Sequence, residues 1–255
     1  MVLSTDAIVL HRFDYSETSV IVRLVTRDAG VQSALARGAR RAKSRFGTAL
    51  DLFAQGSAQI HVKQGRELQT LGAFEITNAR AELGGDLGRF ASASALVELV
   101  LRFGAADDAG DAMFDALAES LDAIAASAPA QAGEAGLAGA WRLVAELGFA
   151  PSLEACALCH DEVDEDAPAP FNRAAGGVMC ARCAREHPGS RPLPPNARAA
   201  IAAWCERGRG ARAPLAARDL RAHQRLLREF LQHHVADGRA LHAFDAWELG
   251  AWSSA

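Results

Sequence analysis

The sequence predicts an α+β multidomain protein, in which an N-terminal small β-barrel is followed by an α-helical domain with an inserted ribbon held by four cysteines. Three observations predict this fold. Short apolar, β-branched runs fill the first 80 residues, helical periodicity replaces them afterwards, and two Cys-x-x-C motifs stand 20 residues apart. The expected bounds are 1–80 for the barrel, 81–255 for the helical domain and 152–190 for the ribbon.

The barrel is expected from five strand-like runs with polar or glycine-containing segments between them. These runs are 4–13, 19–27, 31–36, 53–63 and 68–77. Five short strands with one longer loop after the third are typical of an OB-fold, a small and partly open barrel. A lone small sheet and an SH3-like barrel fit the same pattern nearly as well.

The helical domain is expected from Ala- and Leu-rich segments with apolar residues at helical spacing. These segments are 87–104, 110–127, 134–148, 195–207 and 214–236. Gly148, with Pro151 shortly after it, marks the end of the third segment.

Charge divides the chain into three parts. Residues 1–80 carry a balance of +4, residues 81–170 of −14 and residues 171–255 of +6, although the net charge is only −4. Two basic ends around an acidic middle favour a polyanionic partner, and an ordinary solvated surface is the alternative. No apolar run reaches the ~20 residues of a membrane span, and the N-terminus lacks a signal-peptide pattern, so we expect a cytoplasmic protein without membrane contact.

The two Cys-x-x-C motifs predict a metal site. Each motif lets one tight turn aim two sulfurs at a common point, and two such turns supply four thiolates at tetrahedral corners. The expected ligands of one structural Zn2+ per chain are Cys156, Cys159, Cys180 and Cys183. A closed four-sulfur shell leaves no open position for chemistry, which favours a binding scaffold over a reactive metal.

A zinc deaminase is a competing interpretation of the same region. His160 and Glu162, followed by Cys180 and Cys183, have the spacing of a ligand and catalytic Glu before a Cys-x-x-C. Met179, however, occupies the place of the expected Pro, and the surrounding segment is polar and acidic rather than helical.

A basic loop follows the third expected strand. Its positive residues, five within nine positions, are Arg37, Arg40, Arg41, Lys43 and Arg45. Folding gains nothing from such mutually repelling charges, whereas phosphates neutralise them and release counterions. The loop therefore predicts salt-dependent, sequence-tolerant binding of single- and double-stranded DNA, beside a barrel type that commonly holds single strands. A solvated loop is the alternative.

Aromatic residues for base stacking are sparse near this loop. The candidates are Phe13, Tyr15, Phe46 and Phe53, and of these we expect Phe13 and Phe53 in the core. A binding mode that follows the DNA backbone is therefore favoured over a stacking mode.

A second set of basic residues forms a stripe in the segment 214–236. Its members, at spacings of three and four, are Arg218, Arg221, Arg225 and Arg228. The opposite side is apolar and packs into the domain. The stripe can meet phosphates or an acidic partner peptide, and it can equally cover the acidic middle of the same chain.

Motifs of common enzymes are absent from the sequence. It contains no G-x-x-x-x-G-K-[ST], no H-E-x-x-H and no G-x-S-x-G. We therefore expect a protein that is not an enzyme.

Taken in order, these pieces resemble the RecO family of bacterial recombination mediators over nearly the whole chain. The likeness lies in 8–10 (IVL), 15–19 (YSETS), 24–30 (LVTRDAG), 36–45 (ARGARRAKSR), 143–151 (LVAELGFAP), Phe171, Gly176-Gly177 and the four cysteines. The resemblance implies an N-terminal OB-fold, a helical domain and a zinc ribbon.

The same resemblance implies binding and annealing of single-stranded DNA, with the basic-loop residues on DNA and the four cysteines on zinc. It further implies partnership with RecR, contact with the C-terminal tail of single-strand-binding protein, help in loading RecA, and association with the nucleoid. Arg142 is a candidate for contact with the acidic tail. The alternative function is that of a zinc-ribbon transcription or adaptor protein that binds nucleic acid.

Overall fold

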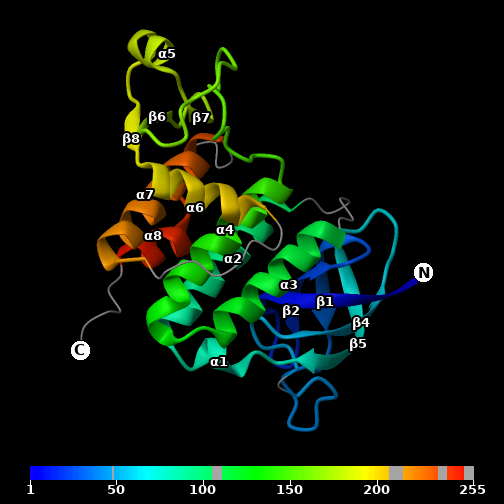
Figure 1. The fold of residues 1–255 in the computed structure, drawn as a ribbon. Coiled ribbons are helices and arrows are strands. Elements are labelled where there is room, and N and C mark those ends of the chain that lie inside the picture. Colours follow the sequence, from blue (N-terminus) through cyan, green and yellow to red (C-terminus); the bar gives the residue numbers. More distant parts are fainter. Residues whose placement is uncertain (48, 105–110, 207–214, 235–239, 250–255) are drawn as a thin grey trace.

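The computed structural model describes the chain except for residues 48, 105–110, 207–214, 235–239 and 250–255. A β-barrel lies at one end, a layer of helices in the middle, and a small ribbon at the far side of the helices (Figure 1). This arrangement confirms the fold class expected from the sequence. Among the described helices, none is both long and apolar enough to cross a membrane.

Five strands close the N-terminal barrel in the order β1-β2-β3-β5-β4. They are β1 (Val2–Asp14), β2 (Val20–Thr26), β3 (Gly30–Ala36), β4 (Gln55–His61) and β5 (Leu68–Asn78). β1 is long enough to pair antiparallel with both β2 and β4, and the parallel pair β3–β5 completes the ring. The barrel is therefore OB-like and not a lone open sheet, and its strands lie within two residues of the expected runs.

The barrel has apolar residues on two sides of its wall. Strand alternation directs one set inward, where Val9, Val22 and Leu24 are fully buried. A second set, which includes Ile8 and Val25, faces outward and joins the core of the helical layer. The barrel and the helices thus share one continuous apolar contact.

The expected positions of the aromatic residues are partly wrong. Phe13 is 46% exposed instead of belonging to the core, because a β-bulge between Val9 and His11 turns the end of β1 outward. Phe53 is buried, as expected, but under the helical layer. Phe46 is buried inside the barrel cluster, so it cannot stack on a base.

The helical layer is built mainly from three long helices and completed by C-terminal ones. The helices are α1 (Ala81–Gly84), α2 (Leu87–Phe103), α3 (Asp111–Ala126), the 3₁₀ turn η1 (Pro129–Gln131), α4 (Ala132–Glu146), α6 (Pro195–Cys205), α7 (Ala217–His234) and α8 (His242–Leu249). Gly148, with φ +83°, follows α4 and accounts for its end. Positions 110, 207, 214 and 235–236 of the expected helices lie outside the described residues.

The acidic helix α3 fastens the barrel to the helical layer. Arg27 at the end of β2 lies 2.8 Å from Asp115, and its guanidinium also stacks 4.5 Å from the ring centre of Phe114. Arg80, which follows β5, donates to Asp122 at 2.6 Å from an almost fully buried side chain. Part of the negative charge of residues 81–170 is therefore neutralised by ion pairs with arginines of the barrel.

The ribbon is a three-stranded sheet with one short helix, inserted between α4 and α6 (Figure 1). Its elements are β6 (Ala169–Asn172), β7 (Gly177–Val178), α5 (Ala181–Glu186) and β8 (Arg191–Leu193). The β6–β7 hairpin turns at Gly176, whose φ is +80°. Gly177 has no room for a side chain, since a Cβ there would lie 2.2 Å from the Ser152 carbonyl oxygen.

Candidate metal centre and nucleic-acid interface

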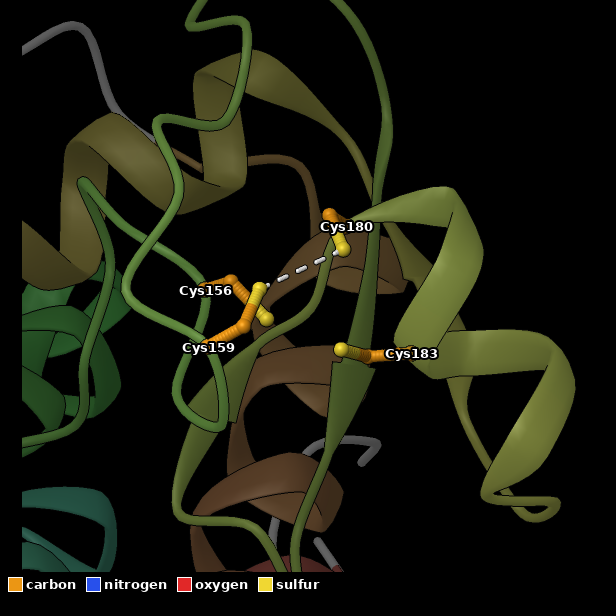
Figure 2. A group of neighbouring side chains, drawn as sticks. All are labelled: Cys156, Cys159, Cys180 and Cys183. Atoms are coloured by element: carbon orange, nitrogen blue, oxygen red, sulfur yellow. Dashed lines mark hydrogen bonds between the residues drawn. The ribbon is translucent and has the colours of Figure 1, made fainter.

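The four predicted cysteine ligands converge at one end of the ribbon. Their side chains point toward a common centre from the loop before β6 and from the start of α5 (Figure 2). All four Sγ atoms lie within 4.8 Å of one another, and those of Cys159 and Cys180 are 3.7 Å apart. Cys156 and Cys183 are buried, whereas the other two are half-buried.

Backbone hydrogen bonds hold the first Cys-x-x-C in a tight turn. The His160 N–H donates to the Cys156 carbonyl at 2.9 Å, and the Cys156 N–H donates to the Asp161 carbonyl at 2.8 Å. His160 takes a left-handed conformation with φ +61°. The turn is joined to β7 because the Ala157 N–H donates to the Val178 carbonyl at 2.8 Å.

The second Cys-x-x-C is formed by a helix start. Cys180 precedes the first residue of α5, and the Ala184 N–H donates to its carbonyl at 3.0 Å. One helical turn then brings the Cys183 sulfur to the same side. Met179, which is fully buried, packs with Cys156 and Cys183 beneath the centre.

The four cysteine thiols differ in pKa. Burial works to raise the pKa of Cys156, but backbone N–H groups of Cys159, Cys180 and Leu158 outweigh it and lower the pKa to about 6. Hydrogen bonding to Cys159, together with burial, raises the pKa of Cys183 to about 12. Four thiolates so close together repel one another, and a bound cation removes that repulsion.

These residues fit a metal ion. A Zn–S bond of about 2.3 Å gives tetrahedral sulfurs about 3.8 Å apart, close to the 3.7 Å between Cys159 and Cys180. The donor set is four sulfurs, the set of closed structural sites. The structure thus brings together all four predicted ligands in a cluster that could hold a metal ion.

The deaminase arrangement is not formed by the described residues. The ligand cluster consists of the four cysteines and does not include His160, which is exposed. Glu162 pairs with Ala155 in an isolated β-bridge, so no helix carries it toward the cluster. The Cys159 thiol donates instead to the Asp161 carboxylate at 3.2 Å.

The basic loop lies on the barrel, and all five of its predicted DNA-binding residues are exposed. The loop leaves β3 after Ala36 and turns at Gly38, which has φ +72°. It is anchored at its far end by Phe46, whose ring is buried in the barrel and lies 5.0 Å from the Arg45 guanidinium. The charged tips therefore project from a loop with fixed ends.

Arg40 ties this loop to the neighbouring end of β1. Its guanidinium lies 3.2 Å from the Asp14 carboxylate and donates to the Ser16 carbonyl at 3.4 Å. Its backbone N–H donates to the Thr18 carbonyl at 3.0 Å. The loop and the β1–β2 connection thus form one surface.

Sequence reasoning predicted the aromatic part of this surface incompletely, because it named Tyr15 as a stacking candidate but expected Phe13 in the core and did not consider His11. His11 and Phe13 stack at 4.2 Å between ring centres, and Tyr15 is 59% exposed. The signal in the sequence is the polar pair His11-Arg12, which follows an unbroken apolar run and marks where β1 leaves the core.

Comparison with known protein families agrees with this architecture. The model "Recombination protein O N terminal" matches residues 1–80, and "Recombination protein O C terminal" matches residues 84–241. The chain belongs to the RecO family. The resemblance seen in the sequence is thereby confirmed.

Curated relatives of this RecO-family chain carry the name DNA repair protein RecO. The one from Anaeromyxobacter dehalogenans (strain 2CP-C) is 37% identical over 92% of both chains. That from Nocardioides sp. is 33% identical over 93% of this chain and 96% of its own. That from Symbiobacterium thermophilum is 35% identical over 74% of both.

The arginine stripe of this RecO-family chain lies on α7, a helix on the side of the helical layer away from the barrel (Figure 1). Arg225 and Arg228 both pair with Glu248 on α8, so they are bound within the C-terminal helices and not to the acidic middle. Arg218 and Arg221 make no ion pair within the part of the chain that the structure describes.

Arg142, the candidate for an acidic partner, is largely buried on α4. It lies 2.5 Å from Glu119 on α3, and its side chain is only 13% exposed. Its Nε and Nη2 atoms are buried without a hydrogen-bond partner among the described residues. This guanidinium therefore has these two buried donors beside the Glu119 carboxylate, which is 57% exposed.

Proposed function

We propose that this protein is a DNA repair and recombination mediator that binds and anneals single-stranded DNA and does no chemistry of its own. The main support is the set of five exposed positive side chains on a loop whose ends are fixed against an OB-like barrel. Membership of the RecO family supports the same function. A loop with fixed ends holds its charges near one another, and phosphates reduce their mutual repulsion. Duplex DNA binds the same loop through the phosphates of the DNA backbone.

Annealing follows from the same charges. Two complementary strands repel each other through their phosphates, and a shared positive surface lowers that repulsion so that base pairing proceeds. No nucleotide hydrolysis is needed for this step, because pairing itself is favourable. The absence of nucleotide-binding and hydrolase motifs from the sequence is consistent with such a role.

Zinc is the proposed metal, and its role is structural. Four cysteine ligands are the set that zinc prefers in closed sites, and none of the four positions is left for a substrate. The ion would neutralise the thiolates and fix the two turns that carry them, without taking part in DNA chemistry.

The proposed partners are RecR, the acidic C-terminal tail of single-strand-binding protein and, indirectly, RecA. Support for an acidic tail comes from Arg218 and Arg221, which are exposed and make no ion pair among the described residues, and from Arg142, whose guanidinium lies beside the exposed carboxylate of Glu119. The proposed setting is the cytoplasm, at the nucleoid. Family membership favours this role over that of a zinc-ribbon transcription or adaptor protein.

An annealing assay tests the proposed function. The rate at which two complementary oligonucleotides pair is measured with the wild-type chain and with a variant in which the five loop cations are replaced by Ala. We expect the variant to lose most of the acceleration, while Arg66→Ala, which removes an exposed cation from the β4–β5 turn, keeps it. Equal acceleration by both variants would refute a role for the loop. Preference for duplex over single strands in competition would favour the adaptor role.

A further inference from the structure

Part of the barrel face around Phe13 is left uncovered by the helical layer. Phe13 and His11 stand two residues apart on β1, both exposed, with their rings stacked at an angle of 28°. Leu68 on β5 is also 37% exposed. A large apolar ring held in one orientation on a polar barrel indicates a surface that binds something.

Strand register places this pair in a continuous band across four strands. One row runs from Phe13 to Ile21 on β2 and to Leu35 on β3. The second row runs from His11 to Arg23, then to Ser33 and Leu68. Directly paired residues share one face of a sheet, so the rings, the apolar side chains and Arg23 lie together.

The β-bulge explains why this band is open. Before the bulge, the outward residues Ile8 and Leu10 are buried under the helical layer, with Val25 opposite Ile8. Beyond it, His11 and Phe13 continue the strand past the edge of that layer. The same sheet face therefore has a covered half and an accessible half.

The positive charges around the band favour an anionic ligand. Arg40 reaches Asp14, the residue after Phe13, so the basic loop borders the open face. Arg37 follows Leu35 by two positions and is exposed. Within the band itself, the Nε of Arg23 is buried without a hydrogen-bond partner among the described residues. Exposed rings among cations match a polymer that offers both phosphates and flat rings.

We propose that this band is a stacking platform for unpaired DNA bases, with Phe13 as its main ring, and that it makes the protein prefer single strands to duplex DNA. The inference rests on the proposed DNA-binding function and adds the mode of recognition. Bases in a duplex are already stacked, so their faces are hidden, whereas those of a single strand are free. The basic loop binds either form through phosphates, and only the platform distinguishes them.

Equilibrium binding to a labelled single strand and to its duplex, at one salt concentration, tests the platform. We expect Phe13→Ala to weaken single-strand binding about tenfold and to leave duplex binding unchanged. Unchanged duplex binding also shows that the variant is folded. Phe13→Trp should restore single-strand affinity, whereas Phe13→Leu, which is equally apolar, should not. Val2→Ala, at an exposed position of the same strand, is the matched control.

A fluorescent purine analogue in the strand gives a second readout, because stacking on a ring quenches its emission. Quenching should occur with wild-type protein and be lost in Phe13→Ala. If Phe13→Ala changes both affinities equally or neither, while Arg40→Ala with Arg41→Ala weakens both, the platform is refuted and the proposed function stands. If the wild-type chain binds neither form, both ideas fail.

Discussion

The Arg40 guanidinium lies 3.2 Å from the Asp14 carboxylate, and this contact joins the basic loop to the end of β1. Both side chains remain substantially exposed, so the pair contributes little to folding stability, on the order of 0–1 kcal/mol. The main effect of this contact is to place the basic loop beside the rings of His11 and Phe13 on β1. In the proposed DNA-binding function, the same carboxylate competes with DNA phosphates for Arg40.

Replacing Asp14 with Asn should therefore increase DNA affinity. Removal of one negative charge from a cationic surface frees Arg40 for phosphate, and we expect an increase of about threefold at low salt, which corresponds to less than 1 kcal/mol. Asp28→Asn, at an exposed position in the β2–β3 turn, is the control and should change little. A fall in affinity for Asp14→Asn would mean that the tether matters more than the competition.

Removal of the metal should loosen the cysteine end of the ribbon and spare the rest. The base of the ribbon packs on the helices, where Phe171 lies 6.2 Å from the ring centre of Phe230 and Glu229 lies 3.1 Å from Arg191. Among the described residues, the cysteine end packs in the small cluster around Met179, and beyond it Arg198 on α6 donates to the Val163 and Asp164 carbonyls. Hydrogen exchange after chelation should rise at 155–163 and 179–187 and stay low in α2 and α4. Loss of protection throughout the helical layer would contradict this account.

Metal binding should release protons, but fewer than four at pH 7. Metal ligands bind as thiolates; Cys156, with a pKa of about 6, is already ionised at pH 7, whereas Cys183, with a pKa of about 12, is protonated. Metal affinity should consequently fall as the pH is lowered through 6, where Cys156 also becomes protonated. Calorimetry in buffers of different ionisation enthalpy counts the protons. A count that does not change between pH 5 and pH 8 would contradict these pKa directions.

Arg80 should be a main determinant of stability at the joint between the barrel and the helices. Its buried guanidinium donates to Asp122, to the Phe53 carbonyl at 2.8 Å and to the Gln55 side chain at 2.6 Å. Arg80→Met removes the donor to the Phe53 carbonyl and to the Gln55 side chain, whereas Asp122 keeps its bond from the Asn78 amide, and we expect a loss of about 3 kcal/mol in urea denaturation. Arg66→Met, at an exposed turn, should stay within about 0.5 kcal/mol of wild type. A loss for Arg80→Met as small as that of the control would refute this role.

Local patterns in the sequence predicted much of this structure. The short apolar, β-branched runs located the barrel strands within two residues, and the paired Cys-x-x-C motifs identified four residues whose sulfurs do converge. Both signals are local, since strand alternation and ligand spacing act within a few residues. The five loop cations are exposed, as the charge argument requires.

Features that depend on tertiary contacts were missed or predicted wrongly. Phe13 was expected in the core, because the bulge after Val9 that carries it past the helical layer leaves only a weak local signal, the polar pair His11-Arg12. The hydrogen-bond partners of Arg80 could not be predicted from local sequence patterns, because they lie 25 to 42 positions away in the chain. The helices α1 and α8, of 4 and 8 residues, are too short for a clear periodicity.

The salt dependence of single-strand binding tests the central claim most directly. Each phosphate contact on a single strand contributes a slope of about −0.7 to the plot of log K against log salt. Replacement of both Arg40 and Arg41 with Ala should weaken binding and make this slope shallower by about 1.4. Unchanged affinity and slope across the salt series, or a wild-type chain that ignores oligonucleotides even in dilute buffer, would contradict the account.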